Sequence, residues 1–170
     1  ASISELGVKA DHFHMPDEKS LISDELKAII SNYDFLILSG GVSKGKKDFI
    51  PEVMEELAVN KLFHRVKQRP GKPFWFGRHT NGVQVFAFPG NPISTYMCYR
   101  VYFVPWLAKN LGRPTENCKA TIISDFVFNP ELGYFLQVSS EFLPDGSVVV
   151  SPQMGNGSGD LANLVKSDAF

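Results

Sequence analysis

The chain has 170 residues, of which 44% are hydrophobic and 21% are charged, and its formal net charge is −1 at pH 7. These values are typical of a globular protein with one domain, or with one domain and a smaller appendage. The near-neutral charge argues against nucleic acid or a membrane surface as a partner, and no apolar run approaches the roughly 18–20 residues that span a bilayer. The first residues also lack the basic and apolar regions of a signal peptide. Only two cysteines occur, Cys98 and Cys118, which favours reduced thiols in a cytoplasmic protein.

The first two thirds of the chain alternate between strand-like and helix-like patterns. Short apolar runs and period-two alternation predict strands, and apolar residues three and four apart predict helices. The segment His79-Thr80-Asn81-Gly82 predicts a hairpin, because Asn-Gly is a strong two-residue hairpin signal. In chain order we expect the end of a helix at 1–6, a weak strand at 8–15, a helix at 21–30, a buried strand at 35–38, a helix at 49–57, a strand at 61–66, hairpin strands at 74–77 and 83–88, and a helix from 92 to about 111 that Pro105 kinks.

This order of elements is typical of an α/β fold with a mainly parallel sheet. The pattern changes near Gly112, where residues 113–117 read as a linker. The strand-like runs that follow, at 120–123, 134–142 and 148–151, predict a small β module. We therefore expect two units, residues 1–111 and residues 112–170.

The first candidate binding element is the turn Ser39-Gly40-Gly41-Val42-Ser43-Lys44-Gly45-Lys46-Lys47-Asp48, between a predicted strand and a predicted helix. Its glycines permit positive φ and a close approach of a ligand to the main chain. The helix start behind the turn offers N–H groups that suit an anion such as phosphate, and Asp48 adds a carboxylate at the expected N-cap position. A tight strand-to-helix turn with solvated lysines would produce the same pattern, so both interpretations stay open.

Two later turns contain similar residues. Pro70-Gly71-Lys72-Pro73 precedes the first hairpin strand, and Pro89-Gly90-Asn91-Pro92 follows the second. In the latter turn Asn91 is a good N-cap and Pro92 a good first helical residue. Ligands of parallel α/β sheets bind at the carboxyl ends of strands, so the three turns can converge on one crevice.

Taken together, the three turns resemble those of the molybdopterin molybdenumtransferases, the MoeA proteins whose eukaryotic relatives include the E domain of gephyrin. The motifs match in order and at suitable spacings, and the β tail with Gly157-Ser158-Gly159 resembles the C-terminal domain of that family. The resemblance covers essentially the whole chain and implies the C-terminal part of a longer enzyme. Residues 1–111 would be an incomplete three-layer, MogA-like molybdopterin-binding domain, and residues 112–170 part of a small β-barrel-like domain.

The resemblance also implies an activity. Members of the family insert molybdate into adenylylated molybdopterin in a step that depends on Mg²⁺ or another divalent metal, release AMP, and are commonly homodimers. One alternative is a molybdopterin adenylyltransferase of the same superfamily, although those proteins typically carry Gly-Gly-Thr-Gly where this chain has Val42-Ser43. The other alternative is a non-catalytic binding or scaffold module on the same fold.

The resemblance to this family implies that the first turn holds a phosphate. Backbone N–H groups from Gly40, Gly41 and Gly45 would contact the anion, with Ser43 as a further donor. Asp48 would bind or orient the divalent ion that neutralises the pyrophosphate. The structural alternative is that Asp48 only caps its helix.

The other candidate residues come from the later turns and from the N-terminal region. Lys72, in the turn with Pro70 and Gly71, would place a positive charge on a phosphate or on molybdate. Gly90 and Asn91 would position the pterin or an anion at a helix start. Asp17 matches one of two acidic positions of the family, with Pro16 at the other, and is a second candidate metal ligand. A solvated turn lysine and a purely structural cap are the alternatives for Lys72 and Asn91. Phe74 and Trp75 are expected in the core rather than stacked on a pterin.

Overall fold

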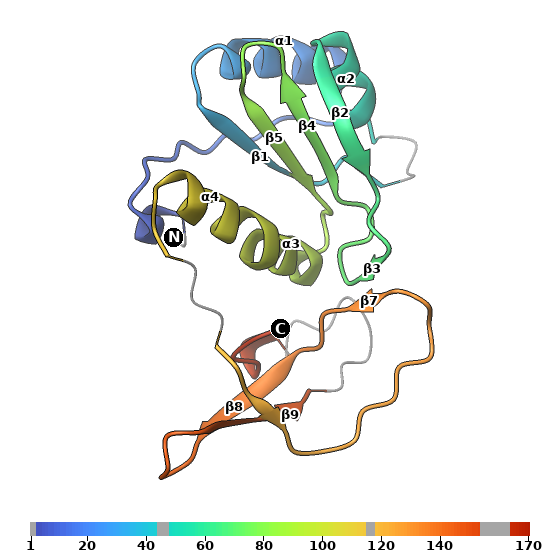
Figure 1. Cartoon of the computed structure of the whole chain (residues 1–170). Helices are drawn as coiled ribbons and strands as arrows, with labels where there is room; N and C mark the ends of the chain where they lie inside the picture. The colour runs from blue at the N-terminus through green and yellow to red at the C-terminus, as the bar shows by residue number, and fades with distance from the viewer. Residues whose placement is uncertain (1–2, 44–47, 115–117, 154–163) are drawn as a thin grey trace.

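A computed structural model describes residues 3–43, 48–114, 118–153 and 164–170, and divides into an α/β part and a smaller β part (Figure 1). The α/β part contains η1 (Ser4–Leu6), α1 (Lys19–Ile30), β1 (Phe35–Ser39), α2 (Ile50–Glu56), β2 (Val59–His64), β3 (Gln68–Arg69), β4 (Trp75–His79), β5 (Gln84–Phe88), α3 (Pro92–Cys98), the π-helix η2 (Tyr99–Phe103) and α4 (Val104–Asn110). The β part contains β6 (Thr121–Ile122), β7 (Gly133–Tyr134), β8 (Val138–Phe142) and β9 (Val148–Pro152).

The main sheet has four strands in the order β1-β5-β4-β2. β1 and β5 pair in parallel, whereas β4 pairs antiparallel with both β5 and β2. The α/β class is therefore confirmed, but the sheet is mixed: of its three strand pairs only β1–β5 is parallel, so the expectation of a mainly parallel sheet is not met in the described strands. The antiparallel pairs follow from short connections, because the predicted Asn81-Gly82 hairpin joins β4 to β5, and β2 returns to β4 through residues 65–74.

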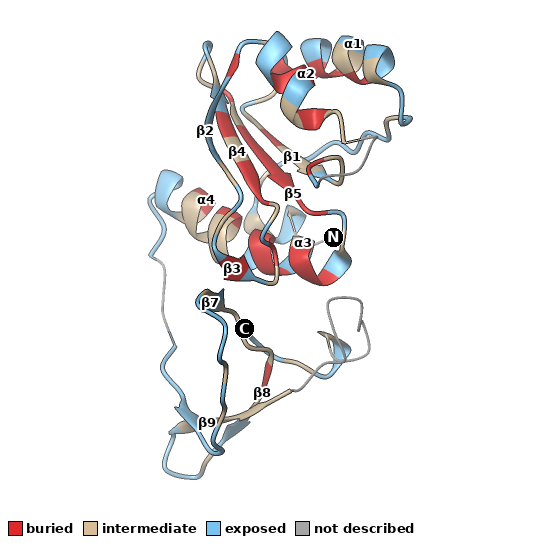
Figure 2. Ribbon diagram, turned by 90° about the vertical axis from the view of Figure 1, so that its right-hand side faces the viewer, coloured by how far each residue is buried: buried red, intermediate tan, exposed pale blue. Residues whose placement is uncertain are grey.

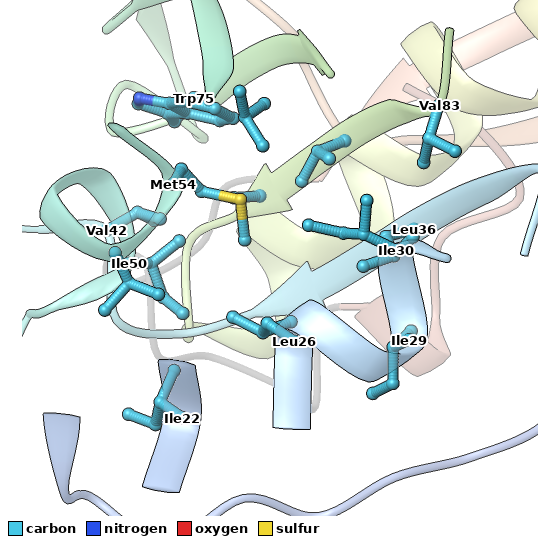
Figure 3. Close-up of a cluster of buried hydrophobic side chains, with 14 residues drawn as sticks. Ile22, Leu26, Ile29, Ile30, Leu36, Val42, Ile50, Met54, Trp75 and Val83 are labelled. Atoms are coloured by element: carbon cyan, nitrogen blue, oxygen red, sulfur yellow. The ribbon is translucent and has the colours of Figure 1, made fainter. Parts of the chain in front are cut away.

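Helices cover both faces of the sheet, which gives the three layers expected (Figure 2). Leu36, Trp75 and Val85 point toward α1 and α2 and belong to the hydrophobic cluster of Figure 3. Their strand neighbours, such as Phe35 and Phe86, pack on the opposite face with α3, η2 and α4. Alternate side chains of a strand point to opposite faces, so a continuous apolar run such as 35–38 is buried from both sides.

The helix α1 confirms the predicted helix at 21–30. Its buried residues are Ile22, Leu26, Ile29 and Ile30, at the spacing of one helical face. Fully burying an aliphatic side chain of this kind contributes about 1.5–3 kcal/mol, and Leu26 is 0% exposed. Lys19 Nζ lies 2.7 Å from carboxylates of both Glu52 and Glu56 on α2, but exposed pairs of this kind contribute little to stability.

The long helix after the third turn is interrupted as Pro105 predicts. The chain runs from α3 through the π segment η2 into α4, and Pro105 lies in the first turn of α4. A proline inside a helix lacks an N–H donor and clashes with the carbonyl four residues earlier. A π-turn just before it is one of the known ways in which a helix accommodates such a defect.

The β part forms a three-stranded sheet in the order β6-β9-β8. A second, two-stranded sheet pairs β7 with β3 of the α/β part. Figure 1 accordingly shows β7 next to β3, where the two parts meet. The predicted strand runs after residue 112 are confirmed in type, while the boundary at residues 111 and 112 stays a prediction.

One predicted element is absent, and two motif segments fall outside the described residues. Residues 8–14 carry no strand hydrogen bonds, and residues 9–14 are exposed, so the weak alternation at 8–15 was wrong as a strand signal. Alternation predicts a strand only where a partner strand and a core face exist. Gly45 and the Gly157-Ser158-Gly159 segment lie outside the described residues. Among the helices of the described ranges, none combines the length and apolarity needed to cross a membrane.

Candidate functional site

The three glycine-containing turns lie at one edge of the main sheet. Ser39 pairs with Phe88 at the carboxyl ends of β1 and β5. Trp75, the first residue of β4, pairs with Ala87 and with His64, the last residue of β2. The turn 39–48 follows β1, the turn 89–92 follows β5, and the turn 70–73 precedes β4. The topology therefore brings the turns to the edge where α/β proteins bind ligands.

Two glycines of the first turn are required by its backbone. Gly40 has φ +98°, and its N–H donates to Phe88 O at 3.0 Å, which extends the β1–β5 ladder by one residue. Gly41 has φ +69°, and a Cβ there would lie 2.6 Å from Ile50 Cγ1. Glycine adopts positive φ without the steric cost of other residues. The turn thus packs directly against the start of α2.

The first and third turns touch each other. A Cβ on Gly90 would lie 3.3 Å from Gly40 Cα. Within the described residues, the backbone N–H groups of Gly41, Val42 and Ser43 donate no hydrogen bond. Unpaired main-chain N–H groups in a turn are the usual protein contribution to an anion site. The place where these turns meet can therefore accept an anion on its main chain.

The third turn is fixed by the cap of α3. Asn91 Oδ1 accepts hydrogen bonds from Ser94 N at 3.2 Å and from Ser94 Oγ at 3.4 Å, and Pro92 begins the helix. This confirms Asn91 as the N-cap. Thr95 Oγ1 also donates to the carbonyl oxygen of Pro89 and lies 3.4 Å from Ser39 Oγ. Thr95 was missed by sequence reasoning, although its place four residues after the cap is a usable signal.

The second turn is buried at Gly71 and exposed at Lys72. Gly71 has φ +86°, and a Cβ there would lie 2.7 Å from Cys98 Sγ and from Met97 Cε. The buried Gln68 donates from Nε2 to Gly71 O at 3.3 Å. Lys72 accordingly stands on a turn whose backbone has little room to shift.

His64 and Val66 connect the first turn to the second. His64 Nε2 lies 3.0 Å from Val42 O, and Val66 N donates to Lys72 O at 3.0 Å. The first turn therefore extends from β1, the outer strand at one side of the sheet, to β2, the outer strand at the other side. Sequence reasoning placed His64 on a strand and assigned it no role. The sequence carried no signal for this role, because the predicted strand extended to residue 66, whereas β2 ends at His64.

The two candidate metal ligands differ in position. Asp48 is half-buried and lies one residue before Phe49, the N-cap of α2, so the expected cap position was wrong by one residue. Asp17 is exposed in the loop before α1. In the described ranges, no three His, Cys, Asp or Glu side chains gather into a group that could hold a metal. Because Mg²⁺ typically uses one or two carboxylates together with substrate phosphates, Asp48 beside the glycine turn fits an ion that arrives with a phosphate ligand.

A pocket of about 420 Å³ opens beside the first and third turns. Aromatic and aliphatic side chains form most of its wall, and Ser39, Gly90 and Thr95 provide polar groups. Such a mixture suits a flat organic ring attached to an anion. The lining residues are Ile3, Ile37, Ser39, Phe88, Gly90, Pro92, Thr95, Tyr96 and Tyr99.

Burial shifts the pKa of two groups next to the second turn. Burial raises the pKa of the Cys98 thiol to about 12. Burial also raises the pKa of the Tyr102 hydroxyl above its ordinary value. Desolvation favours the neutral form of both groups, so neither carries a charge near pH 7.

Residues 1–109 match the family model described as a probable molybdopterin binding domain. The chain belongs to this family. The match covers the α/β part that carries all three turns, and the sequence resemblance to the molybdopterin molybdenumtransferases is confirmed by individual relatives. The molybdopterin molybdenumtransferase of Synechocystis sp. is 36% identical over 158 residues, which are 92% of this chain and 38% of the relative. The enzyme of the same name from Bacillus subtilis is 30% identical over 161 residues, 88% of this chain and 36% of the relative.

Solved structures of family members have the same fold. Two structures of a molybdopterin biosynthesis moeA protein from Pyrococcus horikoshii superpose with TM-scores of 0.68 and 0.66, at 27% and 24% sequence identity. They cover 91% and 90% of this chain, and 36% and 34% of the longer chains. The chain thus spans less than two fifths of the length of these relatives.

Proposed function

We propose that the chain belongs to an enzyme of molybdenum cofactor biosynthesis that inserts molybdate into adenylylated molybdopterin with release of AMP. The observation that carries this function is the contact between the Gly40 and Gly90 turns, next to three main-chain N–H groups without a partner in the described structure. Such groups suit the pyrophosphate of an adenylylated substrate. The apolar pocket beside them is a suitable size for a ring system.

The residues at this edge have complementary roles in binding. Gly40, Gly41, Gly45 and Ser43 hold the pyrophosphate. Lys72, on the turn before β4, would place its ammonium on a phosphate or on molybdate, and a flexible ammonium suits a compact anion. The third turn, with Gly90 and Asn91, directs the N-terminus of α3 toward the ligand, while Pro70 and Gly71 set the backbone below Lys72.

Mg²⁺ is part of the proposal. Bound together with the pyrophosphate, it would neutralise charge that develops on the leaving AMP. Asp48 would hold the ion, with Asp17 as a second candidate ligand. Both carboxylates would bind through oxygen, as Mg²⁺ requires. A homodimer in the cytoplasm belongs to the same proposal for the whole protein, and the two free cysteines agree with a reducing location.

The binding half of this function is tested by calorimetric titration of the chain with magnesium pyrophosphate. Lys72→Ala should weaken binding about tenfold or more, because a hydrogen bond to a charged group contributes roughly 1.5–3 kcal/mol. Arg78→Ala removes an exposed cation near the other end of β4 and is the matched control. Equal weakening by both variants would indicate only long-range charge attraction, and would contradict the site.

The chemical half is tested in the Synechocystis sp. relative, with its matching segment replaced by this chain. AMP released from adenylylated molybdopterin is measured with and without molybdate. We expect release that depends on molybdate and on Mg²⁺, and that Asp48→Asn abolishes while the exposed Asp34→Asn does not. A folded chimera that binds pyrophosphate but releases no AMP would favour the non-catalytic binding module instead.

A further inference from the structure

The buried amide of Gln68 is a feature that the proposed chemistry does not use. Gln68 is 3% exposed and is one of two buried polar residues in the described structure. It precedes the turn that carries Lys72 by two residues. Burying an amide is unfavourable unless its donors and acceptor are paired, so the partners of Gln68 indicate its role.

Both ends of the amide are paired, and they join the turn to the helix layer. Nε2 donates to Gly71 O at 3.3 Å, inside the turn, and lies 3.9 Å from Cys98 Sγ. Oε1 accepts a hydrogen bond from the hydroxyl of Tyr102, which stands on the π segment η2. The turn and the helix layer are therefore held together through one side chain, which we call the Gln68 clamp (Gln68, Gly71, Tyr102).

The β part braces the same segment from its other side. Gly133 N donates to Lys67 O and Phe135 N donates to Arg69 O, each at 2.9 Å. The Tyr102 ring contacts Phe135 and Phe74, with ring centroids 6.3 and 5.1 Å apart. The strand leading into the turn is thus fixed by its backbone toward the β part and by its Gln68 side chain toward η2.

The end of the turn is fixed as well. Lys72 O accepts from Val66 N at 3.0 Å, and Phe74 N donates to Gly71 O at 3.1 Å. The Lys72 side chain itself is exposed. The Lys72 ammonium moves on a flexible stem around its own Cα, so the clamp, by holding the backbone, determines the region that the ammonium can cover.

We infer that Gln68 and Tyr102 are positioning residues for Lys72. This inference rests on the proposed function, which assigns the Lys72 ammonium to a phosphate or molybdate. In this role Gln68 and Tyr102 act through Lys72 rather than by contact with the ligand. Each hydrogen bond of the clamp keeps the 70–73 turn against Met97 and Cys98, and thereby keeps the ammonium at the edge shared with the Gly40 and Gly90 turns. Small displacements of a positioned group carry large losses of binding or rate.

The test is a double-mutant cycle in the titration with magnesium pyrophosphate. Tyr102→Phe removes one hydrogen bond of the clamp and keeps the ring, so the fold is retained. It should weaken pyrophosphate binding about fivefold, less than the loss of the Lys72 ammonium, because the turn loses one of its anchors and keeps the others. Gln68→Met keeps the length of the side chain, removes both hydrogen bonds, and should weaken binding further. In a Lys72→Ala background neither substitution should weaken binding further, because residues that act through one group are not additive.

Asn81→Ala is the matched structural control. Asn81 lies in the hairpin turn at the opposite edge of the sheet, where it donates to Ile30 O at 3.3 Å and accepts from Val83 N at 3.1 Å. Its loss should lower the unfolding midpoint and leave pyrophosphate binding unchanged. The same comparison separates a positioning effect from general loss of stability.

The outcomes distinguish the clamp from the function it serves. If the wild-type chain does not bind magnesium pyrophosphate, the proposed function and the positioning role both fail. If Lys72→Ala weakens binding but Tyr102→Phe and Gln68→Met bind like the wild type, the function stands and the positioning role is wrong. Full additivity with Lys72→Ala would also overturn it, because the clamp would then affect binding independently of Lys72.

Discussion

Replacing Gly71 by alanine tests how tightly the second turn is packed. Gly71 has φ +86°, and a Cβ would lie 2.7 Å from Cys98 Sγ and Met97 Cε and 2.9 Å from Gln68 Nε2. The left-handed backbone costs a non-glycine residue roughly 1–2 kcal/mol, and overpacking a filled core costs about 1–3 kcal/mol more. We therefore expect Gly71→Ala to lower the free energy of unfolding by about 2–5 kcal/mol, a large part of the roughly 5–15 kcal/mol that a typical domain possesses.

Gly82→Ala separates the two contributions. Gly82 has φ +102°, but a Cβ added there would meet no atom within 4 Å, so only the backbone cost applies, about 1–2 kcal/mol. Both variants are compared by urea unfolding, followed by far-ultraviolet circular dichroism and by tryptophan fluorescence. If Gly71→Ala is destabilised no more than Gly82→Ala, within about 0.5 kcal/mol, the close packing of Gly71 against Met97, Cys98 and Gln68 is refuted.

Three further outcomes follow from the cap of α3 and from the two cysteines. Asn91→Ala removes the cap of α3 and should lower the free energy of unfolding in urea by about 1 kcal/mol. Asn91→Asp keeps the cap but should weaken pyrophosphate binding through its negative charge. Equal stability of Asn91→Ala and the wild type would contradict the cap. A thiol reagent should modify the exposed Cys118 rapidly and Cys98 only after unfolding, and equal rates at the two thiols would show that Cys98 is accessible. Burial raises the pKa of Cys98 from 9.0 to about 12. The contribution of the neutral thiol to the free energy of unfolding is therefore present below pH 9 and is lost as pH rises toward 12, by up to about 1.4 kcal/mol per pH unit. Urea unfolding across this range should show a steeper decline in the stability of the wild type than in that of Cys98→Ala.

Local signals in the chain were sufficient for most of the secondary structure. The helix α1 followed from apolar residues on one helical face, and the β4–β5 hairpin followed from Asn81-Gly82. Asn91 and Pro92 marked the start of α3 because capping depends on neighbouring residues alone. The alternation at 8–15 failed for the opposite reason, since a strand also needs a partner that no local pattern specifies.

Only part of the candidate site could be predicted from local signals in the sequence. The glycine turns and Lys72 were identified from their residue types, because positive φ and close packing restrict those positions to glycine. His64, Thr95 and Gln68 were missed, since each acts through a contact with a residue distant in the chain: 22 positions for His64 to Val42, 34 for Gln68 to Tyr102 and 56 for Thr95 to Ser39. Such contacts depend on strand order and on helix placement.

The sequence by itself determined the α/β class, the three turns and their family, because these depend on short-range patterns and on ordered motifs. Only the tertiary structure decided that the Gly40 and Gly90 turns touch, and that the Lys72 turn is held between the π segment and the β part. The physical reason is that side-chain pairing across elements is set by sheet order and packing, which act over distances that no local pattern encodes.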